Sequence, residues 1–222
     1  MATITKNNGI LLADIANNYW VASSIQQSDG KTIVLGQISI TTELGSQNNQ
    51  FSVLRFNANG TLDTTFGNAG ETIIQTSDSF LRDEGFGQQV AVLSDGSIIL
   101  LLNNDKQSYD TENEVFVFDN FFSLLKIRPN GTLDSSFGNA GKVTVDLYPD
   151  TSDTRAGYDG AYSIDVVGND NILVTGYSVN LQNSNNQFTK DSFAANAIYK
   201  FSANGQRDTS FDMDGVLFNA AD

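Results

Sequence analysis

The chain contains no cysteine and no histidine among its 222 residues. The absence of cysteine excludes disulfides, thiolate nucleophiles and zinc–thiolate sites. The absence of histidine removes the side chain that most often transfers protons near neutral pH, and with it the commonest transition-metal ligand. A Ser-His-Asp triad is therefore impossible. A carboxylate pair of the glycosidase kind would be the remaining catalytic chemistry, and the sequence nominates no particular pair for it.

Basic residues are also scarce, with 12 Lys and Arg against 26 Asp and Glu and a net charge of −14. Such a surface repels phosphate backbones and anionic lipid, so we expect no nucleic-acid partner. No apolar segment approaches the roughly 20 residues that cross a bilayer. The opening MATITKNNGILLADIA lacks the charged region and apolar core of a secretory signal. We therefore expect no membrane insertion, and no N-terminal export signal is visible in this chain.

One block is present three times: NANGTLDTTFGNAG at 57–70, RPNGTLDSSFGNAG at 128–141 and SANGQRDTSFDMDG at 202–215. Repetition of this kind indicates an array of similar supersecondary units. The Asn-Gly pair in each block predicts a turn that needs left-handed backbone geometry. The following Asp is expected to cap backbone N–H groups of the next turn, and the Phe to bury its ring beneath it. These structural residues are Asp63, Asp134 and Asp208, and Phe66, Phe137 and Phe211.

Four short apolar or alternating segments flank each block, a pattern typical of strands rather than helices. They predict three units over about 20–76, 88–147 and 161–222 in a single domain spanning 1–222. The segment 9–15 (GILLADI) resembles the fourth strand of a preceding unit. The twelve predicted strands lie at 21–27, 32–38, 51–56, 71–76, 88–93, 97–102, 121–127, 142–147, 161–167, 171–179, 196–201 and 216–220.

The first unit carries Gln-Ser-Asp-Gly-Lys at 27–31, Gly36, Arg55-Phe56 and Leu-Asp-Thr-Thr-Phe-Gly at 62–67. This pattern resembles the bacterial delta-60 repeat family, whose repeats are taken to form β-propellers. The resemblance implies a fold and no shared enzymatic activity or catalytic residue. We therefore predict an all-β, propeller-like array of three four-stranded antiparallel blades plus an extra N-terminal strand. Three blades are fewer than the usual minimum of four, so the ring is either incomplete or closed by oligomerisation.

Strand alternation places the repeated turns on one face and the long, unrepeated loops on the other. The predicted long loops are 41–50, 76–87, 103–120, 148–160 and 180–193. Long loops on a rigid scaffold often hold binding residues, although they are also simply tolerated insertions. Carboxylates mixed with Asn and Ser suit calcium, and aromatic rings beside them suit sugars. The alternative is a solvated acidic surface without a ligand. The candidate ligand-binding residues are Tyr109, Asp110, Glu112, Tyr148, Asp150, Asp153, Tyr158 and Asp159, of which Asp150, Asp153 and Asp159 are the candidate Ca²⁺ ligands.

The function expected from the sequence is a non-catalytic binding or scaffold module of a bacterial secreted or cell-surface protein. Its partner would be a carbohydrate or a protein surface. The alternative is a structural module that completes a propeller with neighbouring repeats of a longer chain or with copies of itself, as a homo-oligomer. A carbohydrate-active enzyme is a third, weaker hypothesis.

Overall fold

A computed structural model describes residues 3–7, 10–14, 19–41, 47–75, 88–110, 115–147, 158–180, 193–212 and 216–220. The described residues form strands and turns and contain no helix, which confirms the prediction of an all-β chain. Within them there is accordingly no helix of the length and apolar character needed to span a membrane.

A four-stranded antiparallel sheet follows the N-terminal segment. Its strands, in the spatial order β3-β4-β5-β6, are β3 (Tyr19–Gln26), β4 (Thr32–Thr41), β5 (Gln47–Phe56) and β6 (Glu71–Ile74). The predicted Ser-Asp-Gly turn joins β3 to β4, and Gly30 has a φ of 83° there, a conformation that glycine adopts at little steric cost. We call β3–β6 the first unit.

The second sheet has eight strands. They are β7 (Gln89–Val92), β8 (Ile98–Asp110), β9 (Val115–Ile127), β10 (Lys142–Val145), β11 (Tyr158–Val167), β12 (Asn171–Asn180), β13 (Phe193–Phe201) and β14 (Val216–Ala220). Only one parallel pair, Tyr158 with Asn120, connects β11 to β9. The sheet thus consists of two antiparallel sets joined at one point, and we call β7–β10 the second unit and β11–β14 the third. The prediction had three separate sheets.

The N-terminal segment forms a small sheet of its own. β1 (Thr3–Asn7) pairs with β2 (Ile10–Asp14) in an antiparallel register. The predicted strand at 9–15 therefore exists, but its partner is β1, a strand that the sequence analysis did not anticipate.

The described parts of two predicted loops, 41–50 and 103–120, are instead strands. β8 and β9 remain paired from Ile98 with Ile127 as far as Asp110 with Val115, so most of the predicted loop 103–120 is a long hairpin. In the same way β4 and β5 extend the pairing to Thr41 with Gln47. The prediction was wrong because it ended each strand where apolar residues became sparse. Backbone ladder bonds need no buried face, and they continue past the core.

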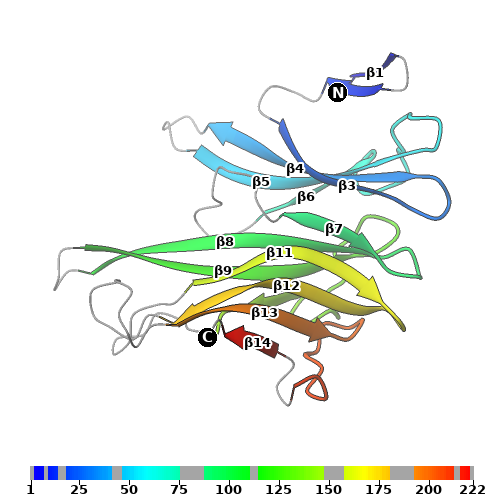
Figure 1. Cartoon of the computed structure of the whole chain (residues 1–222). Coiled ribbons are helices and arrows are strands. Elements are labelled where there is room, and N and C mark those ends of the chain that lie inside the picture. The colour runs from blue at the N-terminus through cyan, green and yellow to red at the C-terminus, as the bar shows by residue number, and fades with distance from the viewer. Residues whose placement is uncertain are drawn as a thin grey trace.

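The three units stack as layers, with a core at each junction (Figure 1). Ile33 and Leu35 of the first unit pack in one cluster with Leu100 of the second. Ile99 of the second unit packs in the other cluster with Val174 of the third. Successive strand residues point to opposite faces. The second unit therefore buries both faces, whereas each outer unit has one face turned toward the second unit and one turned away from it.

Candidate functional site

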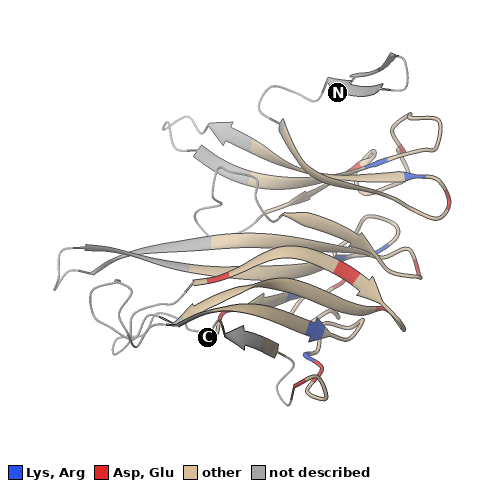
Figure 2. Cartoon of the chain, in the orientation of Figure 1, with Lys and Arg blue, Asp and Glu red and all other residues tan. Residues whose placement is uncertain are grey.

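The repeated turns and the longest hairpin lie on opposite sides of the molecule. In Figure 1 the turns that follow β3, β5 and β13 lie at the right, while β8 and β9 extend furthest to the left. We call these the turn side and the hairpin side. The Lys and Arg residues that Figure 2 colours lie mainly on the turn side. Fixed positive charge therefore accompanies the repeated Asp residues.

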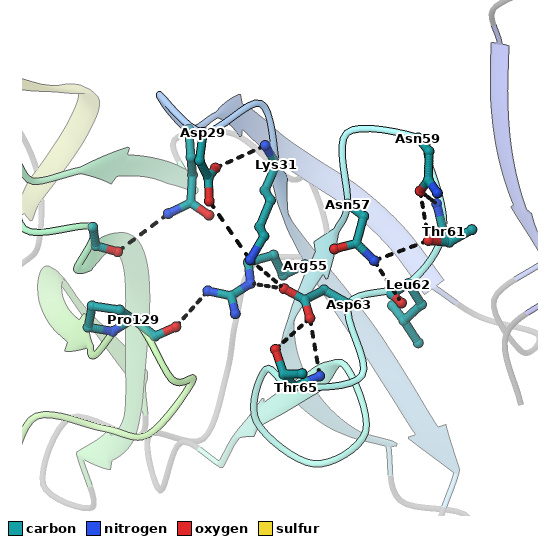
Figure 3. Close-up of polar contacts among 12 residues, drawn as sticks. Asp29, Lys31, Arg55, Asn57, Asn59, Thr61, Leu62, Asp63, Thr65 and Pro129 are labelled. Atoms are coloured by element: carbon teal, nitrogen blue, oxygen red, sulfur yellow. Dashed lines mark hydrogen bonds and ion pairs between the residues drawn. The ribbon is translucent and has the colours of Figure 1, made fainter.

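Asp63 lies at the centre of a buried polar cluster on the turn side (Figure 3). Its Oδ1 accepts hydrogen bonds from the backbone N–H of Thr65 at 3.2 Å and from the Thr65 hydroxyl at 2.6 Å. Its Oδ2 accepts one from Arg55 Nε at 2.8 Å and pairs with Lys31 Nζ at 3.1 Å. The Thr65 hydroxyl and the two cations hold the pKa of the Asp63 carboxyl far below its usual range, although burial opposes them.

The second and third blocks repeat this geometry. Asp134 accepts hydrogen bonds from the backbone N–H and hydroxyl of Ser136 and pairs with Arg128 at 2.9 Å. Asp208 does the same with Ser210 and pairs with Lys200 at 2.8 Å. Hydrogen bonding to Ser136 lowers the pKa of Asp134, while Lys200 and Ser210 lower the pKa of Asp208 to about 2. All three carboxylates are therefore structural caps.

A basic residue recurs eight positions before each of these Asp residues, and the sequence analysis missed it. The residues are Arg55, Lys126 and Lys200. Arg55 also lies over the ring of Phe66 at 4.6 Å, and Lys200 lies over Phe211 at 5.7 Å. The spacing was visible in the sequence. However, its meaning depends on the antiparallel return that brings strand and block together.

Each of the first two blocks also binds the Asn-Gly turn of the next unit. Gly67 N–H donates to the carbonyl of Asn130 at 2.8 Å, and Gly138 N–H donates to that of Asn204 at 3.0 Å. The basic residues reinforce these contacts. Arg55 Nη1 donates to Pro129 O at 2.6 Å, and Lys126 Nζ donates to Ala203 O at 3.3 Å. We call this recurrent set of contacts the inter-unit clasp. It makes the block a connector between units as well as a turn within one.

The clasp leaves no space for a side chain at the Asn-Gly glycine. Gly131 has a φ of 90°, and a Cβ atom there would collide with the backbone of Gly67. Thr72 Oγ1 donates to Gly131 O at 2.6 Å and closes the contact from the other side. The next unit also covers the block's aromatic ring, since Phe66 and Phe137 are 0% and 1% exposed. Phe211, in the third block, is only half-buried.

The structure places two of the predicted ligand residues in β11 rather than in a loop. The predicted loop 148–160 was wrong at its end, because β11 begins at Tyr158. Asp159 is 1% exposed. Its Oδ2 accepts the Leu147 backbone N–H at 2.5 Å, and its Oδ1 accepts the Ser178 hydroxyl. Both carboxylate oxygens thus have partners within the protein, while Tyr158 is half-buried.

The other predicted ligand residues lie in or beside the segments 111–114 and 148–157. The backbones of Tyr109 and Asp110 are in β8, opposite Phe116 and Val115, and their side chains are outside what the structure describes. Four further residues lie outside the described residues altogether: Glu112, Tyr148, Asp150 and Asp153. Among the side chains that are described, no three acidic groups gather in a way that could hold a metal ion. The calcium site at Asp150 and Asp153 stays a prediction.

Comparison with known proteins agrees with the strand pattern of the first unit. No curated protein matches the chain. Residues 27–66 match the model of a family described as "Domain of unknown function (DUF5122) beta-propeller". The matched segment runs from the end of β3 through β4 and β5 to Phe66 of the first block. This part of the chain is therefore similar to a propeller-type repeat.

Proposed function

We propose that the chain is an array of three β-propeller blades of the delta-60 repeat type. We further propose that it serves as a non-catalytic binding or scaffold module of a bacterial secreted or cell-surface protein. The observation that carries the proposal is the clasp. The acidic groups that recur within the block, Asp63, Asp134 and Asp208, bind the protein's own N–H groups and cations. These recurring Asp residues therefore have a structural role, and we expect the ligand contacts in the parts of the chain that differ between units.

Support for three blades comes from the equivalence of the three antiparallel sets. Each set has four strands in sequential order, with a copy of the block between its third and fourth strands. The sets pack face to face through apolar residues. Among the described residues, the parallel pair of Tyr158 with Asn120 is the only ladder contact between the second and third sets. Face-to-face packing of four-stranded sheets is the arrangement of a propeller.

The hairpin side is the proposed ligand side. Its central element, the β8–β9 hairpin, has 13 residues in each strand and extends beyond the apolar core. The sequence from Asp105 to Asp119 contains five acidic and three aromatic residues. Carboxylates beside aromatic rings suit a carbohydrate, because rings stack on sugar faces and carboxylates accept bonds from hydroxyls. Calcium is the second candidate ligand, since it prefers the same hard oxygen donors.

Shortening the hairpin tests this proposal. Asp105 pairs with Asn120, so replacing residues 106–119 by Asn-Gly would close a two-residue turn without changing the register. We expect the melting temperature to stay near that of the parent protein and carbohydrate binding on a glycan array to be lost. Equal glycan binding by the shortened and parent proteins would contradict the proposed ligand side.

A matched control is the Leu133→Glu variant, which adds an acidic residue on the turn side at an exposed position. It should keep the parent glycan profile. Melting the parent and shortened proteins with and without added calcium then separates the two ligand classes. If added calcium raises the melting temperature of the parent protein and not that of the shortened protein, calcium binds at the hairpin.

A structural, self-assembling module is the second candidate function. Two observations favour it. The outward faces of the first and third units carry exposed apolar residues, and each of these units carries one half of an inter-unit clasp.

A further inference from the structure

The exposed apolar residues of the described chain concentrate on the outward faces of the first and third units. In the first unit, Ile74 packs toward the second unit, so its neighbour Ile73 faces away from it. Val21 pairs with Gly36, the neighbour of the core residue Leu35, and therefore also faces away. In the third unit, Val166 and Val216 pack toward the second unit, so Val167 and Leu217 face away. Seven large apolar residues are exposed among those described: Trp20, Val21, Ile73, Leu133, Tyr162, Val167 and Leu217. Four of the seven thus lie on these two faces.

The third unit also carries half of a clasp. Arg55 and Lys126 each bind their block Asp and a carbonyl of the next Asn-Gly turn. Lys200 occupies the same position. Within the described residues its ammonium group pairs with Asp208 and lies over the Phe211 ring of its own block, and no carbonyl of a further Asn-Gly turn bonds to it. Asp212 replaces Gly67 and Gly138, whose N–H groups donate across the two filled clasps. Its φ of 48° is close to their 54°, so its N–H keeps the same orientation.

Leu217 occupies the position of Thr72 and Val143, as the β-ladder registers show. Thr72 donates to Gly131 O, and a Cβ atom at Gly205 would collide with the Val143 side chain. Both residues therefore touch the next Asn-Gly turn. Leu217 is 39% exposed, and no such turn contacts it within the described part of the chain.

The first unit carries the complementary half of a clasp, an Asn-Gly turn. Its Asn-Gly turn has the same internal bond as the two turns that fill clasps. Gly60 N–H donates to Asn57 O at 2.8 Å, as Gly131 N–H does to Arg128 O at 2.8 Å. Gly60 has a φ of 84° against 90° for Gly131. Ala58 and Asn59 correspond to Pro129 and Asn130, whose carbonyls accept the clasp hydrogen bonds, and both are exposed.

We infer that the third unit binds the first unit of a second copy of this chain, with Lys200 and Asp212 N–H donating to the Ala58 and Asn59 carbonyls of the other molecule. Val21 and Ile73 of one copy would cover Val167 and Leu217 of the other. This inference rests on the proposed three-blade array. Two copies of three units would make a closed ring of six, within the range of about 4–8 blades that propellers use. A head-to-tail contact that closes in this way forms a symmetric ring.

The test measures molar mass in solution by size-exclusion chromatography with light scattering. We expect the parent chain to have twice its chain mass of 24.0 kDa. Val21→Glu and Leu217→Glu alter opposite faces, and each would bury an unpaired charge at the contact. Each should weaken association by about 100-fold, which corresponds to two steps of 1.4 kcal/mol. Leu133→Glu is the matched control, because Leu133 is 40% exposed and belongs to the second unit.

Mixing the two face variants gives a signature of a head-to-tail contact. Each variant retains one intact face, and the two intact faces are complementary, so the mixture should form a dimer with one intact interface although neither variant associates alone. A monomeric parent chain would overturn the inference, as would equal association by Leu217→Glu and Leu133→Glu. Either failure leaves the glycan test of the hairpin side untouched. Conversely, glycan binding that persists after the hairpin is shortened would contradict the proposed ligand side without changing the oligomeric state.

Discussion

The first two copies of the block and the third have nearly the same local structure but different surroundings. In all three, the Asp caps the residue two positions later and pairs with a basic residue from the preceding strand. The rings of Phe66 and Phe137 are 0% and 1% exposed, and each belongs to a core cluster that includes residues of the next unit. Phe211 keeps its position over the block and is half-buried. The local contacts of the block thus form without a following unit, whereas full burial of its ring accompanies packing against one, so we expect the first two blocks to contribute more to stability.

The largest expected effect comes from removing the covered rings. Phe66→Ala and Phe137→Ala should each lower the free energy of unfolding by about 3–5 kcal/mol, because each leaves a cavity between two units. Phe211→Ala should cost clearly less, since part of its ring already contacts solvent. Urea unfolding of the three variants measures the difference. Equal losses at all three positions would show that burial by the next unit does not matter.

A smaller effect is expected from blocking one clasp. Gly131→Ala and Gly96→Ala share the strain of a side chain at positive φ, since the two φ values are 90° and 81°. At Gly96 a Cβ atom would meet only Pro129, at 3.7 Å, whereas at Gly131 it would collide with Gly67. Gly131→Ala should therefore be less stable than Gly96→Ala by about 1–3 kcal/mol, the usual cost of overpacking.

Gly96→Ala is the control that isolates the clasp from backbone strain. If the two variants unfold at the same urea concentration, strain explains both, and the contact between Gly131 and Gly67 adds nothing to stability.

The smallest expected effect is a dependence on acidic pH. The pKa values of Asp63, Asp134 and Asp208 are all lowered in the folded protein. The unfolded chain, with an Asp pKa of about 3.9, therefore binds protons more tightly than the folded one. The stabilisation is fully present above this value and is lost as pH falls toward about 2, the folded pKa of Asp208. Thermal melts between pH 5 and pH 2 measure it.

Asp63→Asn removes the most buried of the three carboxyls, whose side chain is 5% exposed against 14% for Asp134 and 23% for Asp208. The variant should be less stable than the parent at pH 5, and the two should converge as pH falls. A constant difference between them over this range would show that ionisation of Asp63 does not contribute.

Much of the fold could be predicted because each unit repeats local signals. All twelve predicted strands overlap observed strands. Turns rich in Asp, Asn and Gly separate the apolar segments of every unit, so each strand could be recognised from its neighbours in the sequence. The strand ends could not be predicted. Asp105 and Lys106 looked like loop residues because their side chains are polar, yet their backbones continue the ladder opposite Asn120 and Asp119.

The candidate site shows the same limit. Asp159 was expected at the loop face because of its charge and its neighbours in the sequence. Its environment is instead set by Ser178 and by the backbone of Leu147, from two other segments. Ser178 and Leu147 are distant from Asp159 in the sequence, so no local sequence pattern predicts them as its partners.

The sequence alone determined the period, the turns and the residues that cap them, because these depend on backbone conformations and hydrogen bonds within a few residues. The tertiary structure decided which of the repeated residues also face another unit. Arg55 binds Pro129 and Gly67 binds Asn130, more than 60 residues away in the chain. Such contacts depend on how one layer stacks on the next, and that stacking comes from burying two apolar faces together rather than from any short stretch of sequence.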